Sequence, residues 1–235
     1  MPFRRTIVLL CVLLGLLAIG WLALRHMAPT QQDGADAGAG VTVDKEPENF
    51  ASRTFDPANP PAEMPPMVPG EEAVCDSDFI SNVSVKGEPL QTDATHALVT
   101  ITQVEVTLQL NITIWAPADA SQHVIEHEEG HRQISEYYYQ TADKIAERIA
   151  ATYIGKKYLV SGADLNAESS KFLQQTGTEI TDEYNAELDP GPTQLRYDDV
   201  TDHSRNDVAA ADAVAQVLND KALAATPPAD ADPGK

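Results

Sequence analysis

Residues 127–131 have the types and spacing of a zinc-binding motif, His-Glu-Glu-Gly-His, in a segment with a helical pattern. On a helix, residues four apart lie on one face, so His127 and His131 can bind one Zn²⁺ in two of its tetrahedral positions. Glu128 can take the proton of a metal-bound water without ligating the metal. Gly130 costs the helix about 1 kcal/mol relative to alanine, which predicts a packing or access reason for its presence. The motif therefore predicts a metal site that activates water.

A third histidine leaves a second frame open. Residues 123–127 fit the inverted motif HxxEH and share His127 with the first frame. One metal cannot take all three histidines, because residues eight apart on a helix are about 12 Å apart along its axis. We favour the frame of residues 127–131, which makes His123 a residue of the first helical turn or one that supports a ligand.

A catalytic zinc site needs three protein ligands and one open position, so a third ligand must come from elsewhere in the chain. One candidate is His203, in the polar stretch of residues 196–206, which would give a site of three histidines. The alternative is a site of two histidines and a carboxylate from an expected second helix. Its candidates are Glu179, Asp182, Glu183 and Glu187. The residues alone leave this choice open.

The flanking patterns predict an α+β domain. Residues 100–115 give the strongest strand signal, because apolar and polar residues alternate from Val104 on, and residues 79–85 predict another strand. Helices are expected over residues 119–151, capped by Asp119 or Ser121, and over residues 163–188 and 207–224. We expect a small zincin-like domain in which a short antiparallel sheet packs on a long HExxH helix, with further helices. A sheet edge in metallopeptidases often pairs with an extended peptide and lays it over the metal.

The charge of the chain argues against nucleic acid as a partner, and the positions of its cysteines argue against a disulfide bond. The 235 residues include 16 basic and 36 acidic ones, a net charge of −20, which argues against a nucleic-acid partner because phosphate binding needs a basic patch. The two cysteines, Cys11 and Cys75, lie far apart, the first within an apolar N-terminal stretch, so we predict no disulfide bond between them.

The chain divides into four segments. Residues 1–27 contain an apolar run of about 19 residues after Arg4 and Arg5, which predicts an uncleaved signal anchor that spans a membrane, with its N-terminus in the cytoplasm. Cleavage of this segment as a signal peptide is the alternative. Residues 28–72 are proline-rich and acidic, and we expect a disordered linker. Residues 73–224 form the predicted metallopeptidase domain, and residues 225–235 a disordered tail.

Two motifs carry a resemblance to a known family. One is the HExGH pattern of residues 127–131, and the other is Tyr-Asp-x-x-Thr-x-His over residues 197–203. With Trp115-Ala116-Pro117 at the end of the strand, the chain resembles a bacterial family of predicted secreted zinc-dependent proteases, a domain of otherwise unknown function. The resemblance covers about residues 75–220. The chain departs from the family pattern at Ser204, where glycine is usual.

The resemblance implies roles for individual residues and a location. His127 and His131 would be zinc ligands, Glu128 the general base and His203 the third ligand. The domain would lie in the periplasm, held by a single-pass anchor in the bacterial inner membrane, or would be secreted after signal cleavage.

We therefore expect a membrane-anchored or secreted zinc peptidase that hydrolyses a peptide or protein substrate with Glu128 as general base. Tyr197 or Arg205 could stabilise the oxyanion, and the carboxylates that could orient a ligand imidazole are Asp198, Asp202 and Glu126. The alternative is a non-catalytic module that binds or organises components of the cell envelope, with a structural or vestigial metal site. A third reading is that the histidines lie on the surface and bind no metal.

Overall fold

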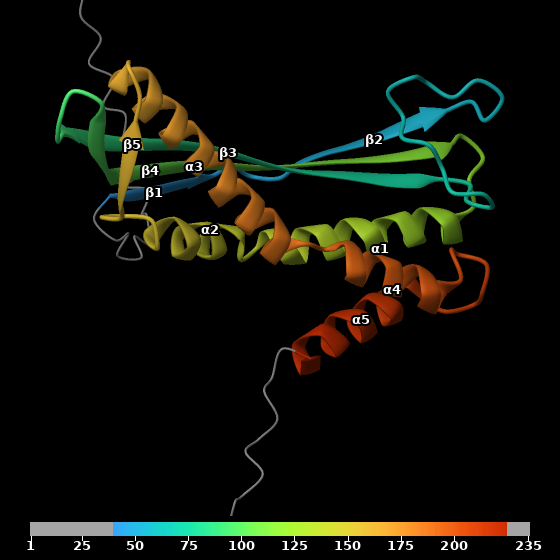
Figure 1. The fold of residues 1–235 in the computed structure, drawn as a ribbon. Coiled ribbons are helices and arrows are strands. Elements are labelled where there is room, and N and C mark those ends of the chain that lie inside the picture. Colours follow the sequence, from blue (N-terminus) through green and yellow to red (C-terminus); the bar gives the residue numbers. More distant parts are fainter. Residues whose placement is uncertain (1–39, 225–235) are drawn as a thin grey trace, which may run out of the picture. The chain divides into compact units, whose positions relative to one another are not determined.

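The structure, a computed structural model, describes residues 40–224 (Figure 1). The expected anchor at residues 1–27 and the tail at residues 225–235 lie outside this range. Among the described helices, none has both the length and the apolar character needed to cross a membrane.

A single long strand, β4 (His96–Pro117), organises the sheet. On one edge it pairs antiparallel with β3 (Val74–Gln91) over nearly its whole length. Its other edge is shared in succession by β5 (Lys157–Ser161), antiparallel, and by β1 (Val41–Lys45) and β2 (Asn49–Phe55), both parallel. The α and β content agrees with the expectation, but the sheet is mixed and its two main strands are long, so the expectation of a short antiparallel sheet was wrong.

Two of these strands correct the predicted linker. β1 and β2 lie within residues 28–72, which the composition had suggested to be disordered. The physical reason is that β4 would otherwise have an unpaired edge, and both strands bring one apolar side chain into the core, since Val41 and Phe55 are buried. The folded domain therefore begins by Val41 rather than at residue 73.

The predicted helix over residues 119–151 is two helices, α1 (Gln122–Tyr139) and α2 (Ala142–Ala151). Ser121 caps α1 as expected, since its side chain accepts a hydrogen bond from the Val124 amide at 3.2 Å. The break follows Tyr139. There Lys45 Nζ donates to the carbonyl oxygens of Tyr139 and Gln140 at 3.2 and 3.0 Å, which satisfies groups left open at the end of α1.

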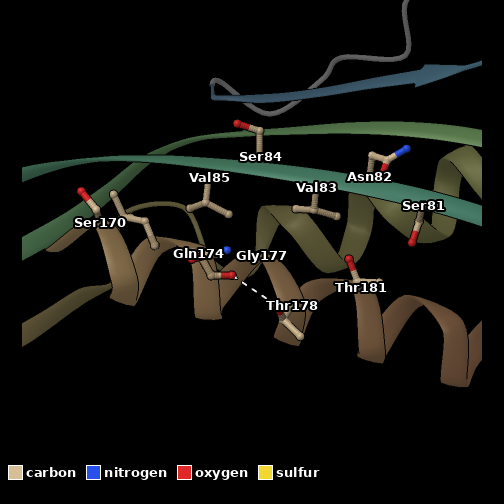
Figure 2. Close-up of a pocket in the computed structure, with 11 residues that line it drawn as sticks. Ser81, Asn82, Val83, Ser84, Val85, Ser170, Gln174, Gly177, Thr178 and Thr181 are labelled. Carbon is tan, nitrogen blue, oxygen red and sulfur yellow. Dashed lines mark hydrogen bonds between the residues drawn. The ribbon is translucent and has the colours of Figure 1, made fainter. Parts of the chain in front are cut away.

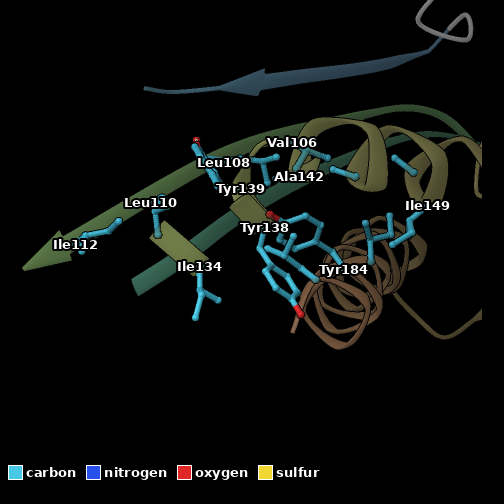
Figure 3. Packing of buried hydrophobic residues seen from close by; sticks show 14 of the residues in the cluster. Val106, Leu108, Leu110, Ile112, Ile134, Tyr138, Tyr139, Ala142, Ile149 and Tyr184 are labelled. Carbon is cyan, nitrogen blue, oxygen red and sulfur yellow. The ribbon is translucent and has the colours of Figure 1, made fainter. Parts of the chain in front are cut away.

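Helices α1 and α2 run along one face of the sheet (Figure 1). Their apolar side chains pack against the inward-facing residues of β4. Figure 3 shows this core, in which Leu108 and Leu110 of β4 lie near Ile134 and Tyr138 of α1. The remaining helices are α3 (Leu165–Leu188), α4 (Gly191–Thr201) and α5 (Ala210–Ala224). α4 begins at the Pro-Gly-Pro break and packs against α1, which brings residues 191–201 to the motif.

Candidate metal centre

Three donor atoms from α1 and α4 converge at one point. His127 Nε2 and His131 Nε2 are 3.2 Å apart. Asp198 Oδ1 lies 3.4 Å from the first nitrogen and 2.9 Å from the second. Within residues 40–224, these two histidines and one aspartate form a group that could hold a metal ion.

The spacing of these donors fits a small tetrahedral ion. Zinc bonds of about 2.0–2.1 Å place the donor atoms of a tetrahedral site about 3.3 Å apart, close to the separations found here. Asp198 Oδ1 is buried and has no hydrogen-bond partner, although two nitrogens lie near it. A buried carboxylate oxygen without a hydrogen bond is costly, and coordination to a cation would remove that cost. The residues therefore fit a metal ion by geometry and by chemistry.

Gln194 fixes the ring of His131. Its Oε1 accepts from His131 Nδ1 at 2.7 Å, while its Nε2 donates to the His131 carbonyl and to Ser135 Oγ at 3.1 and 3.0 Å. Because an amide oxygen only accepts, Nδ1 carries a ring proton, and in the neutral ring Nε2 therefore presents its lone pair to the donor group. Such support of a ligand imidazole is usual at metal sites.

Tyr197 explains the glycine of the motif. Its ring stacks on that of His127 at a centroid distance of 5.0 Å, and its hydroxyl donates to the His127 carbonyl at 3.1 Å. A Cβ atom at Gly130 would lie 2.1 Å from the Tyr197 hydroxyl oxygen. Glycine is thus required for α4 to pack closely on the HExxH turn of α1. This is a packing reason of the kind that the sequence led us to expect.

Glu128 lies in the wall of a cavity of about 380 Å³, next to His131 and Asp198. We call this the Glu128 cavity; on the sheet side it is lined by Cys75, Ser77 and Phe79 of β3. Glu128 is itself only 4 % exposed. Burial raises its pKa to about 7, although the charge of His131 opposes this shift. A carboxyl group of this pKa can accept a proton near neutral pH without being a metal ligand.

The imidazoles and carboxylate of the group shift one another's pKa. Burial lowers the pKa of His127. Burial acts in the same direction on His131, but Asp198 outweighs it and raises the pKa of that histidine. Burial would raise the pKa of Asp198, yet the two neighbouring imidazoles hold it well below its ordinary value. Asp198 is therefore an anion at neutral pH, as a ligand for a divalent cation must be.

His203 lies beside the group rather than in it. Its Nδ1 is 3.8 Å from Asp198 Oδ1 and 3.1 Å from Glu71 Oε1. The chain around it, residues 202–204, has three consecutive non-glycine residues with positive φ. The structure thus brings Asp198, which the sequence suggested only as an orienting carboxylate, into the place expected for His203. Glu71 was not anticipated, because it belongs to the segment interpreted as a linker.

The other expected site residues have different partners. Tyr197 is buried and its hydroxyl is committed to a backbone carbonyl. Arg205 donates to Asp202, so neither residue directs its hydrogen-bond donor toward the donor group, although the Tyr197 ring lies against both histidines. His123 Nε2 lies 2.9 Å from the Asn206 carbonyl oxygen, which leaves the frame of residues 127–131 as the one that forms the group.

The carboxylates of α3 do not join the group either. Glu183 accepts a hydrogen bond from Tyr153 at 2.7 Å, and Glu187 pairs with Arg148. The structure therefore does not place a carboxylate of α3 as the third ligand.

Comparisons with known protein families, with curated proteins and with solved structures found no match for this chain.

Proposed function

We propose that the chain is a zinc-dependent peptidase in which His127, His131 and Asp198 hold the metal. The observation that carries the proposal is the convergence of three donor atoms within 3.4 Å of one another beside a buried carboxyl group that is not one of them. Two imidazoles and a carboxylate suit zinc among the common divalent metals. The motifs of the sequence support the same reading.

Residues 40–224 bring three donors together rather than four, which favours a catalytic over a structural site. Structural zinc sites are closed by four protein ligands, whereas catalytic sites keep one position open. A zinc ion held here would supply a Lewis acid and lower the pKa of a bound water. Glu128, with its pKa raised to about 7, would accept the proton of that water and pass it to the leaving amine.

The edge of β3 supports a polypeptide substrate. Among the described strands, β3 pairs only with β4, so its second edge has no strand partner. Cys75 of this strand lines the cavity together with Glu128, and Ser77 and Phe79 follow along the same cavity wall. An extended chain lying along this edge would pass Glu128 and the donor group. Periplasmic location through an anchor at residues 1–27 remains part of the proposal.

The test is zinc content and hydrolysis in the full-length chain, purified in detergent. We expect about one zinc per chain by mass spectrometry and cleavage of unfolded casein. Asp198→Ala should lose most of the zinc and His203→Ala should keep it. Zinc retained in Asp198→Ala but lost in His203→Ala would restore His203 as the third ligand. Absence of zinc from the wild type would refute the proposal, and zinc without hydrolysis would favour the non-catalytic envelope module.

A further inference from the structure

A second cavity lies further along the same strand. It is a groove of about 540 Å³ between β3 and α3, formed by residues 81–85 of the strand and six residues of the helix (Figure 2). The helix residues are Ser170, Leu173, Gln174, Gly177, Thr178 and Thr181. We call it the β3–α3 groove. None of its functional groups takes part in the metal centre.

The groove continues the wall of the Glu128 cavity. Alternate residues of a strand point to one face, and Cys75, Ser77 and Phe79 line the Glu128 cavity. The next residues on that face belong to the groove, and Figure 2 shows Ser81, Val83 and Val85 directed toward α3. Phe79 and Ser81 are about 7 Å apart along a strand, so one extended ligand can reach both cavities.

The chemistry of the groove suits the main chain of a polypeptide. Val83, Val85 and Leu173 provide apolar surface, and the remaining side chains are hydroxyls and amides with no charge among them. The chain as a whole carries a net charge of −20, but the lining of the groove is uncharged. The groove is therefore not suited to recognise a ligand by ion pairing. Hydroxyl and amide groups can both donate and accept, as successive peptide groups require.

Two details of the groove concern its polar groups and its shape. The hydroxyl oxygen of Ser81 is buried and has no hydrogen-bond partner, so it offers an unused donor and acceptor. Gly177 lets α3 approach the backbone of β3 closely along the groove, since a Cβ atom there would lie 3.2 Å from the Val83 carbonyl oxygen. Gln174 and Thr178 border this part of the groove and are exposed.

We propose that the β3–α3 groove is a second binding subsite for the polypeptide substrate. It engages a flanking segment of an extended chain whose scissile bond lies at the Glu128 cavity. The inference rests on the proposed peptidase function and deepens it, because it assigns the substrate class: unfolded or extended polypeptides long enough to reach both cavities, rather than short peptides.

The test uses two peptides with one scissile sequence, taken from a mapped cleavage site in unfolded casein. One has about 16 residues, long enough to span both cavities, and the other about six. We expect the zinc-loaded full-length protein to cleave the long peptide with a kcat/KM about tenfold higher, mainly through a lower KM. Gln174→Trp, which fills the groove, should remove this advantage and leave the short peptide unaffected.

Gln175→Trp is the matched control, since Gln175 is the adjacent exposed glutamine and does not line the groove. Equal kcat/KM for the two peptides, or equal effects of the two tryptophan variants, would overturn the subsite. If the wild type cleaves nothing, the peptidase proposal fails by itself. Affinity for unfolded casein, measured in Glu128→Gln with and without each tryptophan exchange, then decides the groove: weaker binding only with Gln174→Trp supports it, and unchanged binding overturns it.

Discussion

Helix α3 and helix α1, on which α4 packs, both lie against the β3–β4 sheet, but the two sides differ in how they bury some of their polar groups. In α3, buried Ser169 and Thr176 each donate to a carbonyl of their own helix, at 2.7 and 3.1 Å. Buried Thr201 of α4 does the same at 2.8 Å, but buried Ser135 of α1 and Thr193 of α4 bond across elements, to Ser77 of β3 and to Tyr138 of α1. Self-satisfied hydroxyls leave a helix free to pack by shape, whereas bonds across elements fix their relative position.

The two sides also differ in the backbone at a helix end, which is ordinary at the start of α3 and strained at the end of α4. Asp164 caps α3 by accepting from the amides of Asn166 and Ala167, an ordinary start. α4 ends in three consecutive left-handed residues, from Asp202 to Ser204. Each such residue costs about 1–2 kcal/mol, and strain of this kind gathers at functional sites. The α1–α4 side therefore contains backbone conformations that are unfavourable for stability, whereas α3 does not.

The largest effect should come from Glu128→Gln, which tests whether the α1–α4 side carries chemistry. Removing a general base should lower kcat by about 10³-fold while zinc content stays the same, because Glu128 is not a ligand. Hydrolysis of casein and zinc content of the same preparation measure both. Glu129→Gln is the control, since Glu129 pairs with Arg132 on the helix surface and should change kcat little. Equal losses in the two variants would remove Glu128 from the mechanism.

The next prediction compares two buried helical glycines, Gly130 on the α1–α4 side and Gly177 in α3. Gly130→Ala should destabilise the fold by about 3 kcal/mol, because its Cβ would meet the hydroxyl and ring of Tyr197 at 2.1–3.1 Å. Gly177→Ala on α3 meets its nearest atom at 3.2 Å and gains helix propensity, so we expect a change within about 1 kcal/mol. Urea unfolding of the metal-free proteins measures both. Similar losses would mean that the close fit of α4 on α1 is not special.

Sequence patterns predicted the parts of this site that lie on one element. His127, Glu128 and His131 share a helix, so their spacing alone fixed their relation. The alternation of residues 100–115 likewise predicted the core of β4. Strands β1 and β2 were not predicted, because their residues are mostly exposed and polar and become ordered only by pairing with the open edge of β4.

Asp198 shows what was missed and which signal was present. Gln194, Tyr197, Asp198 and Thr201 have the spacing of one helical face. Interpreting residues 191–201 as a helix that starts after the Pro-Gly-Pro break would have placed all four toward α1. The family-like motif drew attention to His203 instead, and only the left-handed turn after Thr201 shows that this ring lies beside the donor group.

A smaller effect concerns pH in the metal-free protein. Burial raises the pKa of Glu128 from 4.5 to about 7, so the folded state binds this proton more tightly than the unfolded chain does. The contribution of Glu128 to the free energy of unfolding should therefore be largest below pH 4.5 and fall as pH rises to about 7. Glu128→Gln stays neutral and should be more stable than wild type by about 2 kcal/mol at about pH 8, with little difference at about pH 4.5.

Urea unfolding with a chelator present, at both pH values, measures this difference. An equal gain in stability at both pH values would show that ionisation of Glu128 is not its cause. Glu129→Gln is the control and should give no gain in stability, because that carboxylate is partly exposed and paired with Arg132.

The smallest effect addresses the buried hydroxyls directly. Ser135→Ala removes a group that lies 2.9 Å from Ser77 Oγ and accepts from Gln194 at 3.0 Å, so polar groups of β3 and α4 lose a buried partner. We expect a loss of about 1–2 kcal/mol by urea unfolding. Ser169→Ala on α3 removes only a bond to its own helix, and alanine gains helix propensity, so the change should stay within about 0.5 kcal/mol. If Ser169→Ala proved the more costly exchange, polar burial in α3 would matter as much as in α1–α4, and the contrast between the two sides would rest on the glycines and the strained turn alone.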